Sequence, residues 1–113
     1  MGASVFRAAA TGNGPIVETF VVPVGQVYRV ISVMLHLNTA AATSQNFTIT
    51  LDAEDGPVYD TLLYALDLAA GATVNLVWQP DVDLYLMGGD GLDVAWANTD
   101  GRTWSLLLTR ERV

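Results

Sequence analysis

Few side chains in this sequence could carry out chemistry, and they do not combine into a catalytic set. His36 is the only histidine and cysteine is absent, so a cluster of imidazole or thiolate metal ligands is excluded. No serine or threonine lies in the Gly-x-Ser-x-Gly context of a hydrolase nucleophile. We therefore interpret His36 as a packing or interface residue, and we predict no enzyme activity and no cofactor.

The acidic side chains form two groups, which are Asp52, Glu54 and Asp55 in the first and Asp81 and Asp83 in the second. Calcium takes about six to eight oxygen ligands that converge in space, and the first group lacks the spacing of an EF-hand. A glycosidase needs two carboxylates at a fixed separation across a cleft. A small β-sandwich rarely contains such a cleft. We interpret both groups as solvated turn charges and predict no metal site.

The aromatic side chains suggest packing and recognition instead. Three tryptophans share the alternation of their apolar neighbours and are expected in the core, namely Trp78, Trp96 and Trp104. A planar row of exposed tyrosines would suit stacking on sugar rings, whereas tyrosines also line protein interfaces. We favour a role in protein interfaces because the chain is poor in charged residues. The four tyrosines are Tyr28, Tyr59, Tyr64 and Tyr85.

The elements that must position these side chains are β-strands. Asn-Gly and Asp-Gly pairs accept positive φ angles and signal tight turns, and here they separate short runs in which apolar residues alternate. The pattern predicts an all-β fold, an antiparallel β-sandwich of the jelly-roll type with about eight strands. Residues 92–98 and 102–110 are expected to form a hairpin. The expected core is Phe20, Ile31, Val33, Leu35, Leu37, Phe47, Ile49, Leu51, Leu76, Trp78, Leu92, Val94, Trp96, Trp104, Leu106 and Leu108.

The chain has more apolar residues than one small core needs. It has 113 residues, 51% of them hydrophobic and only 15% charged, against about 25% charged in an average domain. We expect one β-sandwich domain over residues 15–113, preceded by an N-terminal arm or short strand over residues 1–14 that reaches a neighbouring subunit. The predicted interface residues are Phe6, Tyr28, Met34, His36, Tyr59, Leu63, Arg110 and Arg112.

The charge balance excludes two classes of partner. The net charge is −7, and the five basic residues are all arginines. Nucleic acid and anionic membranes both attract basic surfaces, so neither is expected to bind. The sequence contains no apolar run typical of a signal peptide or a membrane span. The absence of cysteine favours an intracellular folding compartment, or one that does not depend on oxidation.

Most of the chain, and above all the part from Trp78 onward, resembles small decoration (cement) or head-associated proteins of tailed bacteriophages. The resemblance rests on Trp78-Gln79-Pro80, Leu84-Tyr85-Leu86, the segment Gly89 to Asn98, Thr103-Trp104-Ser105-Leu106, and earlier on Tyr28 to Val33 and Phe47 to Asp52. It implies a non-enzymatic jelly roll that is made in the host cytoplasm and resides in the virion. It further implies a homo-oligomer, a trimer, that clamps neighbouring copies of the major capsid protein. The alternative is a carbohydrate- or receptor-binding module of a phage tail or fibre.

Overall fold

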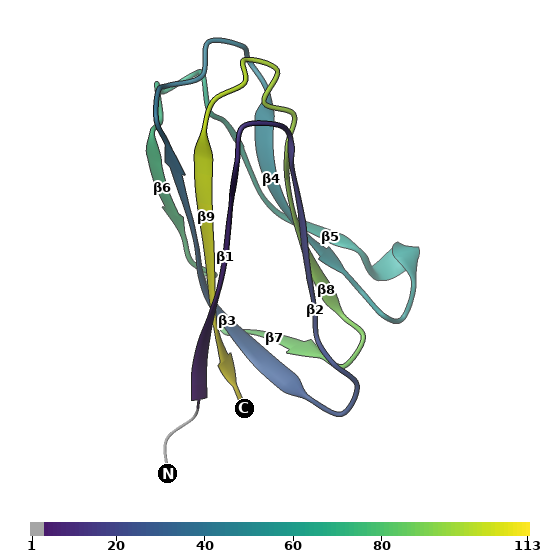
Figure 1. Ribbon diagram of the computed structural model, residues 1–113. Coiled ribbons are helices and arrows are strands. Elements are labelled where there is room, and N and C mark those ends of the chain that lie inside the picture. Colours follow the sequence, from purple (N-terminus) through teal and green to yellow (C-terminus); the bar gives the residue numbers. More distant parts are fainter. Residues whose placement is uncertain (1–3) are drawn as a thin grey trace.

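The computed structural model describes residues 4–113 and contains two antiparallel sheets packed face to face (Figure 1). We call them sheet A and sheet B. Sheet A contains β1 (Ser4–Gly12), β9 (Trp104–Arg112), β3 (Val27–Leu37), β6 (Asn75–Trp78) and β7 (Leu84–Met87). Sheet B contains β2 (Ile16–Val21), β8 (Gly91–Trp96), β4 (Asn46–Asp52) and β5 (Thr61–Asp67), and a 3-10 turn, η1 (Pro57–Tyr59), lies between β4 and β5. The predicted antiparallel β-sandwich is confirmed, with nine strands in the described part of the chain.

The strand order is that of a jelly roll. Sheet A has the order β1-β9-β3-β6 and sheet B the order β2-β8-β4-β5. β7 pairs with β3 from Val27 to Val30, and β6 pairs with the same strand from Val33 to His36. β6 and β7 therefore occupy a single strand position that is interrupted around Pro80. Counted that way, the fold is two four-stranded sheets whose strands come alternately from distant parts of the chain.

The predicted hairpin between residues 92–98 and 102–110 is wrong. β8 pairs with β2 and β4 in sheet B, whereas β9 pairs with β1 and β3 in sheet A. The intervening Asp100-Gly101 pair does form a tight turn, with Gly101 at a φ of 67°. That turn is a corner between the two sheets, because a turn dipeptide sets the local backbone but not the partner of the strand that follows it.

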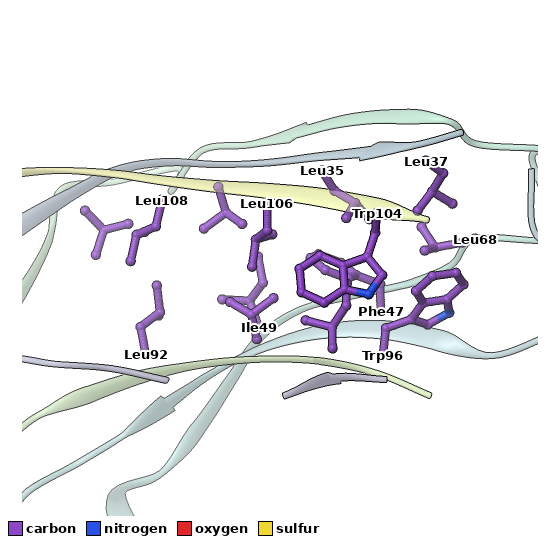
Figure 2. Close-up of a cluster of buried hydrophobic side chains, with 14 of the residues drawn as sticks. Leu35, Leu37, Phe47, Ile49, Leu68, Leu92, Trp96, Trp104, Leu106 and Leu108 are labelled. Carbon is purple, nitrogen blue, oxygen red and sulfur yellow. The ribbon is translucent and has the colours of Figure 1, made fainter. Parts of the chain in front are cut away.

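The core lies between the sheets, where Trp96 and Trp104 lie beside Phe47 and Leu37 (Figure 2). Most predicted core residues are buried. Phe20, Leu51, Leu76 and Trp78 are only partly buried and pack against the core. The core also includes residues that the alternation did not indicate, which are Ile16, Val22, Tyr28, Val30, Ala41, Leu68 and Leu86.

A bulge in β3 explains the largest error in the predicted core. The register of β3 with β9 shifts between Val30 and Ser32. The extra residue, Ile31, reverses the facing of the strand, so that Val30 and Val33 both point into the core and Ile31 is partly exposed. The predicted placement of Ile31 in the core is therefore wrong.

One corner of the sandwich is held by the side chain of Asn98. Asn98 is buried at a φ of 50°, and its Nδ2 donates to the carbonyl oxygens of Gly14 at 2.8 Å and Arg102 at 2.9 Å. Its Oδ1 accepts from the backbone N–H of Arg102 at 2.9 Å. The indole Nε1 of Trp104 also donates to the Gly14 carbonyl, at 2.8 Å. These bonds fasten the β1–β2 turn to the β8–β9 turn.

The described part of the segment 1–14 is a strand within the sandwich. β1 pairs with β9 from Ser4 opposite Arg112 to Gly12 opposite Trp104, without a register shift. Residues 1–3 lie outside the described residues. β1 spans nine residues and forms one edge of sheet A (Figure 1).

Candidate interaction surface

The outward face of sheet A carries a row of apolar side chains across four strands. Ala9 of β1 lies opposite Leu107 of β9, Leu107 opposite Met34 of β3, and Met34 opposite Val77 of β6. We call these four residues the apolar row. Met34 is 38% exposed and Val77 57% exposed, and a shallow hollow lies between them and Leu107. The row is a contiguous apolar patch facing solvent.

Polar groups flank the apolar row on one side. The Nδ1 of His36 lies 2.6 Å from the Oδ1 of Asn75 on the neighbouring strand, and Ser105 is opposite His36 on the other side. The hydrogen bond fixes the imidazole beside Asn75 on the surface. His36 therefore lies at the rim of the apolar row.

Charges flank the row on its other side, and most of them are paired. The Nε of Arg29 donates to the Oε1 of Glu111 at 3.1 Å, and its Nη1 lies 3.8 Å from the Oδ1 of Asp83. Arg7 lies on the outward face of β1, opposite Thr109. Two arginines and two carboxylates leave this region close to neutral, although the chain as a whole carries −7.

The outward face of sheet B has a different character. Its central strands present threonines and carboxylates, and the Oγ1 of Thr19 donates to Asp93 at 2.8 Å. The charge of Asp60, with smaller effects of burial and of Asp93 and Asp90, raises the pKa of Asp52. Carboxylates thus repel one another on this side. The negative charge of the chain is concentrated away from the apolar row.

A second cluster lies toward the ends of β1 and β9, where an arginine is surrounded by aromatic rings. The guanidinium carbon of Arg110 lies 4.0 Å from the ring centre of Phe20 and 5.5 Å from that of Tyr28. Phe6 and Tyr28 meet edge to face at 6.0 Å. The Nε and Nη1 of Arg110 are buried without a hydrogen-bond partner in the described structure, so the arginine is held by its stacking on the rings. Arg112 is exposed.

The predicted interface residues therefore fall in separate places. Met34 and His36 belong to the apolar row and its rim, and Phe6 joins the arginine cluster. Tyr59 is exposed in η1, whereas Leu63 is partly buried and lines a hollow with Trp78. The outward placement expected for Tyr28 is wrong, because the bulge in β3 turns its side chain into the core, where it is 7% exposed.

Three residues of the apolar row were not predicted, namely Ala9, Leu107 and Val77. A signal for Leu107 is present in the sequence, since Leu106, Leu107 and Leu108 are consecutive. In a strand such a run must place one leucine on the face opposite the other two. Val77 lies likewise between Leu76 and Trp78. The alternation marks these outward residues, but only the strand order shows that they lie side by side.

The two acidic groups lie in different parts of the sandwich: Asp52 ends β4 in sheet B, whereas Asp81 and Asp83 lie between β6 and β7 of sheet A. Asp83 is paired with Arg29, and Asp81 lies on the rim of the hollow that contains Trp78. Within residues 4–113, no three histidine or acidic side chains are close enough to hold a metal ion. In the same residues, no helix has the length and apolar character to cross a membrane.

No protein-family model matches this chain, and a search of curated proteins found no significant match.

Proposed function

We propose that this chain is a non-enzymatic structural protein of a bacteriophage head, a decoration or cement protein that binds the major capsid protein and further copies of itself. The resemblance described above implies a trimer on the capsid surface, made in the host cytoplasm before it joins the virion. The observation that carries the proposal is the apolar row, a contiguous apolar patch on a chain whose net charge is −7.

The apolar row supports a binding role on energetic grounds. Removing apolar surface from water contributes about 25 cal/mol per Å², which must offset the freedom that is lost on association. Large exposed apolar patches in soluble proteins mark interaction sites. Many such contacts on one shell would link neighbouring capsid proteins without any catalysis.

The charge distribution supports the same role. A protein on a DNA-filled shell should not bind nucleic acid, and the net charge of −7 disfavours such binding. The near-neutral surroundings of the apolar row would let that face meet another protein with little charge repulsion. Sheet A would therefore face the capsid and sheet B the solvent.

The carbohydrate-binding alternative has no comparable support. It needs a row of exposed tyrosines, but Tyr28 is buried and Tyr64 is partly buried. The exposed Tyr59 and Tyr85 lie in η1 and β7, which belong to different sides of the sandwich. We therefore propose the head role alone.

Two matched substitutions test the proposal. Val77→Asp places a charge in the apolar row, and Val17→Asp places the same charge on the outward face of β2 at the edge of sheet B; both valines are exposed, at 57% and 78%. Co-sedimentation with heads assembled from the major capsid protein of the same genome measures binding. We expect Val77→Asp to weaken binding at least about tenfold, the equivalent of about 1.4 kcal/mol, and Val17→Asp to bind like the wild type. Absence of binding by the wild type, or equal binding by both variants, would contradict the proposal.

A further inference from the structure

β1 is the least protected edge of the sandwich. It ends sheet A, spans nine residues and pairs with β9 without interruption. It contains no proline and a single charged residue, Arg7. A long edge strand of this kind offers unpaired backbone N–H and C=O groups to another strand.

The other three edges are less suited to pairing. β2 is six residues long, is bounded by Pro15 and Pro23 and carries Glu18. The pairing of β4 with the edge strand β5 shifts register between Ile49 and Thr50. The opposite edge of sheet A is divided into β6 and β7, of four residues each. Short strands, prolines and bulges are the features by which proteins prevent edge pairing, so their absence from β1 singles it out.

The inward side of β1 covers the edge of the core mainly with small side chains. Its inward residues include Ala8 and Ala10, which lie opposite Leu108 and Leu106 of β9. These small side chains border a groove between β1 and β2, whose lining also includes Glu18, Thr19, Phe20, Leu92, Val94, Leu106 and Leu108. The groove lies beside the same free edge, so a strand added to β1 would also cover it.

We propose that β1 pairs antiparallel with β1 of a second copy of this chain, about a two-fold axis at Ala8. In this register Ser4 of one copy lies opposite Gly12 of the other, so all nine residues of both strands pair. Ala8 lies opposite Ala8, and both sheets A join into one continuous sheet. The contact is the same on both copies, as two-fold symmetry requires.

The side chains favour this register over its neighbours. Phe6 lies opposite Ala10 of the second copy, so the largest inward side chain of β1 meets one of the smallest, beside the groove. Phe6 is 40% exposed in the single chain. Arg7 lies opposite Ala9 of the second copy, whereas a shift of two residues in one direction would place Arg7 opposite Arg7, and like charges directly opposite destabilise a sheet.

The choice of a second copy follows from these matches within β1 itself. When two copies of β1 pair in this register, all nine residues overlap. The large Phe6 lies opposite the small Ala10, and no two charged side chains lie opposite each other. The inference concerns contacts between copies, and it holds whether or not the chain binds a phage head. Where copies also form trimers through another surface, the contact at β1 joins the trimers in pairs.

Disulfide trapping tests the register. The chain has no cysteine, so Ala8→Cys introduces a single thiol that would face its equivalent at a Cα separation of about 4.5–5.5 Å, within the range of a disulfide. Ala9→Cys is the matched control, because two Ala9 residues would be offset along the strands and lie beyond the roughly 7 Å limit. We expect oxidation to link Ala8→Cys into dimers on a denaturing gel at least about tenfold faster than Ala9→Cys. Equal rates, or no dimer, would overturn the proposal.

Sedimentation equilibrium of the unmodified chain tests the contact itself. We expect a species of twice the 12.1 kDa chain mass, or another even multiple. Phe6→Ala should weaken the association at least about tenfold, since it removes a buried aromatic ring from each copy, and Tyr59→Ala should leave it unchanged. Urea unfolding of each variant confirms that it is folded. A chain that stays monomeric at about 100 micromolar would overturn the proposal, and so would an isolated trimer.

Discussion

The Asn98 corner allows a prediction whose size follows from the structure. We consider the replacement Asn98→Ala. It removes the two Nδ2 donors to the carbonyls of Gly14 and Arg102 and the Oδ1 acceptor for the N–H of Arg102, all at 2.8–2.9 Å. The Gly14 carbonyl keeps the indole N–H of Trp104, but both backbone groups of Arg102 lose their side-chain partner.

The expected cost has two parts. Each hydrogen bond contributes about 1 kcal/mol to stability, so the three bonds together contribute about 3 kcal/mol. Asn98 has a φ of 50°, a conformation that costs an alanine about 1 kcal/mol or more. We expect Asn98→Ala to lower the free energy of unfolding by about 4 kcal/mol. Asn98→Gly, which accepts the positive φ, should lose about 3 kcal/mol.

Urea unfolding followed by tryptophan fluorescence measures both values, and Asn46→Ala, an exposed asparagine of β4, is the control. A loss below about 1 kcal/mol for Asn98→Ala would show that this side chain does not hold the corner. A glycine variant less stable than the alanine variant would refute the backbone part of the reasoning.

Three further predictions concern charges and packing. The backbone N–H and the hydroxyl of Thr43 donate hydrogen bonds to the Asp100 carboxylate and lower its pKa. The charged carboxylate therefore stabilises the fold fully above the ordinary aspartate pKa. This stabilisation is lost as the pH falls through the lowered pKa of the folded state. Asp100→Asn should therefore lower the melting temperature at pH 7 and have little effect once the wild-type carboxyl is protonated. Asp52 has a raised pKa, chiefly because of Asp60; Asp52→Asn should raise the melting temperature at pH 7, and the gain should vanish below the ordinary aspartate pKa. A methyl group on Gly88 would lie 2.9–3.1 Å from the backbone at residues 23–25, so Gly88→Ala should cost about 1–3 kcal/mol in urea unfolding. Gly14→Ala, where nothing lies within 4 Å of the added methyl group, should cost little. An unchanged melting temperature at pH 7 in either aspartate variant would contradict the first two predictions. Equal losses of stability in Gly88→Ala and Gly14→Ala would contradict the third.

Alternation was a good guide to the strands and to most of the core. Leu35, Leu37, Phe47 and Ile49 are buried as their spacing predicted, because alternate residues of a strand must face opposite sides. The sandwich and its jelly-roll type were likewise predicted, but no strand order was, and the one predicted pairing, the hairpin between residues 92–98 and 102–110, is wrong. Tyr28 and Ile31 were assigned to the wrong faces, since a bulge changes the facing within a strand without leaving a mark in the residue types.

The candidate site was less predictable than the fold. Met34 and His36 were recognised as outward residues of one strand. Their neighbours Val77 and Leu107 come from strands about 40 and 70 residues further along the chain, and only the sheet order brings them together. The hairpin at Asp100-Gly101 failed for a related reason, because local turn geometry does not decide which strands pair across a sandwich.

The position of β9 also has a consequence for biosynthesis. β9 lies between β1 and β3 in sheet A and leaves the ribosome after the other eight described strands. Until then β1 has no partner on either side within this domain, and β3 can pair only with β6 and β7. Sheet A therefore closes only after translation of residues 104–112, and a chain stalled before that point would expose its earliest strand to chaperones and proteases.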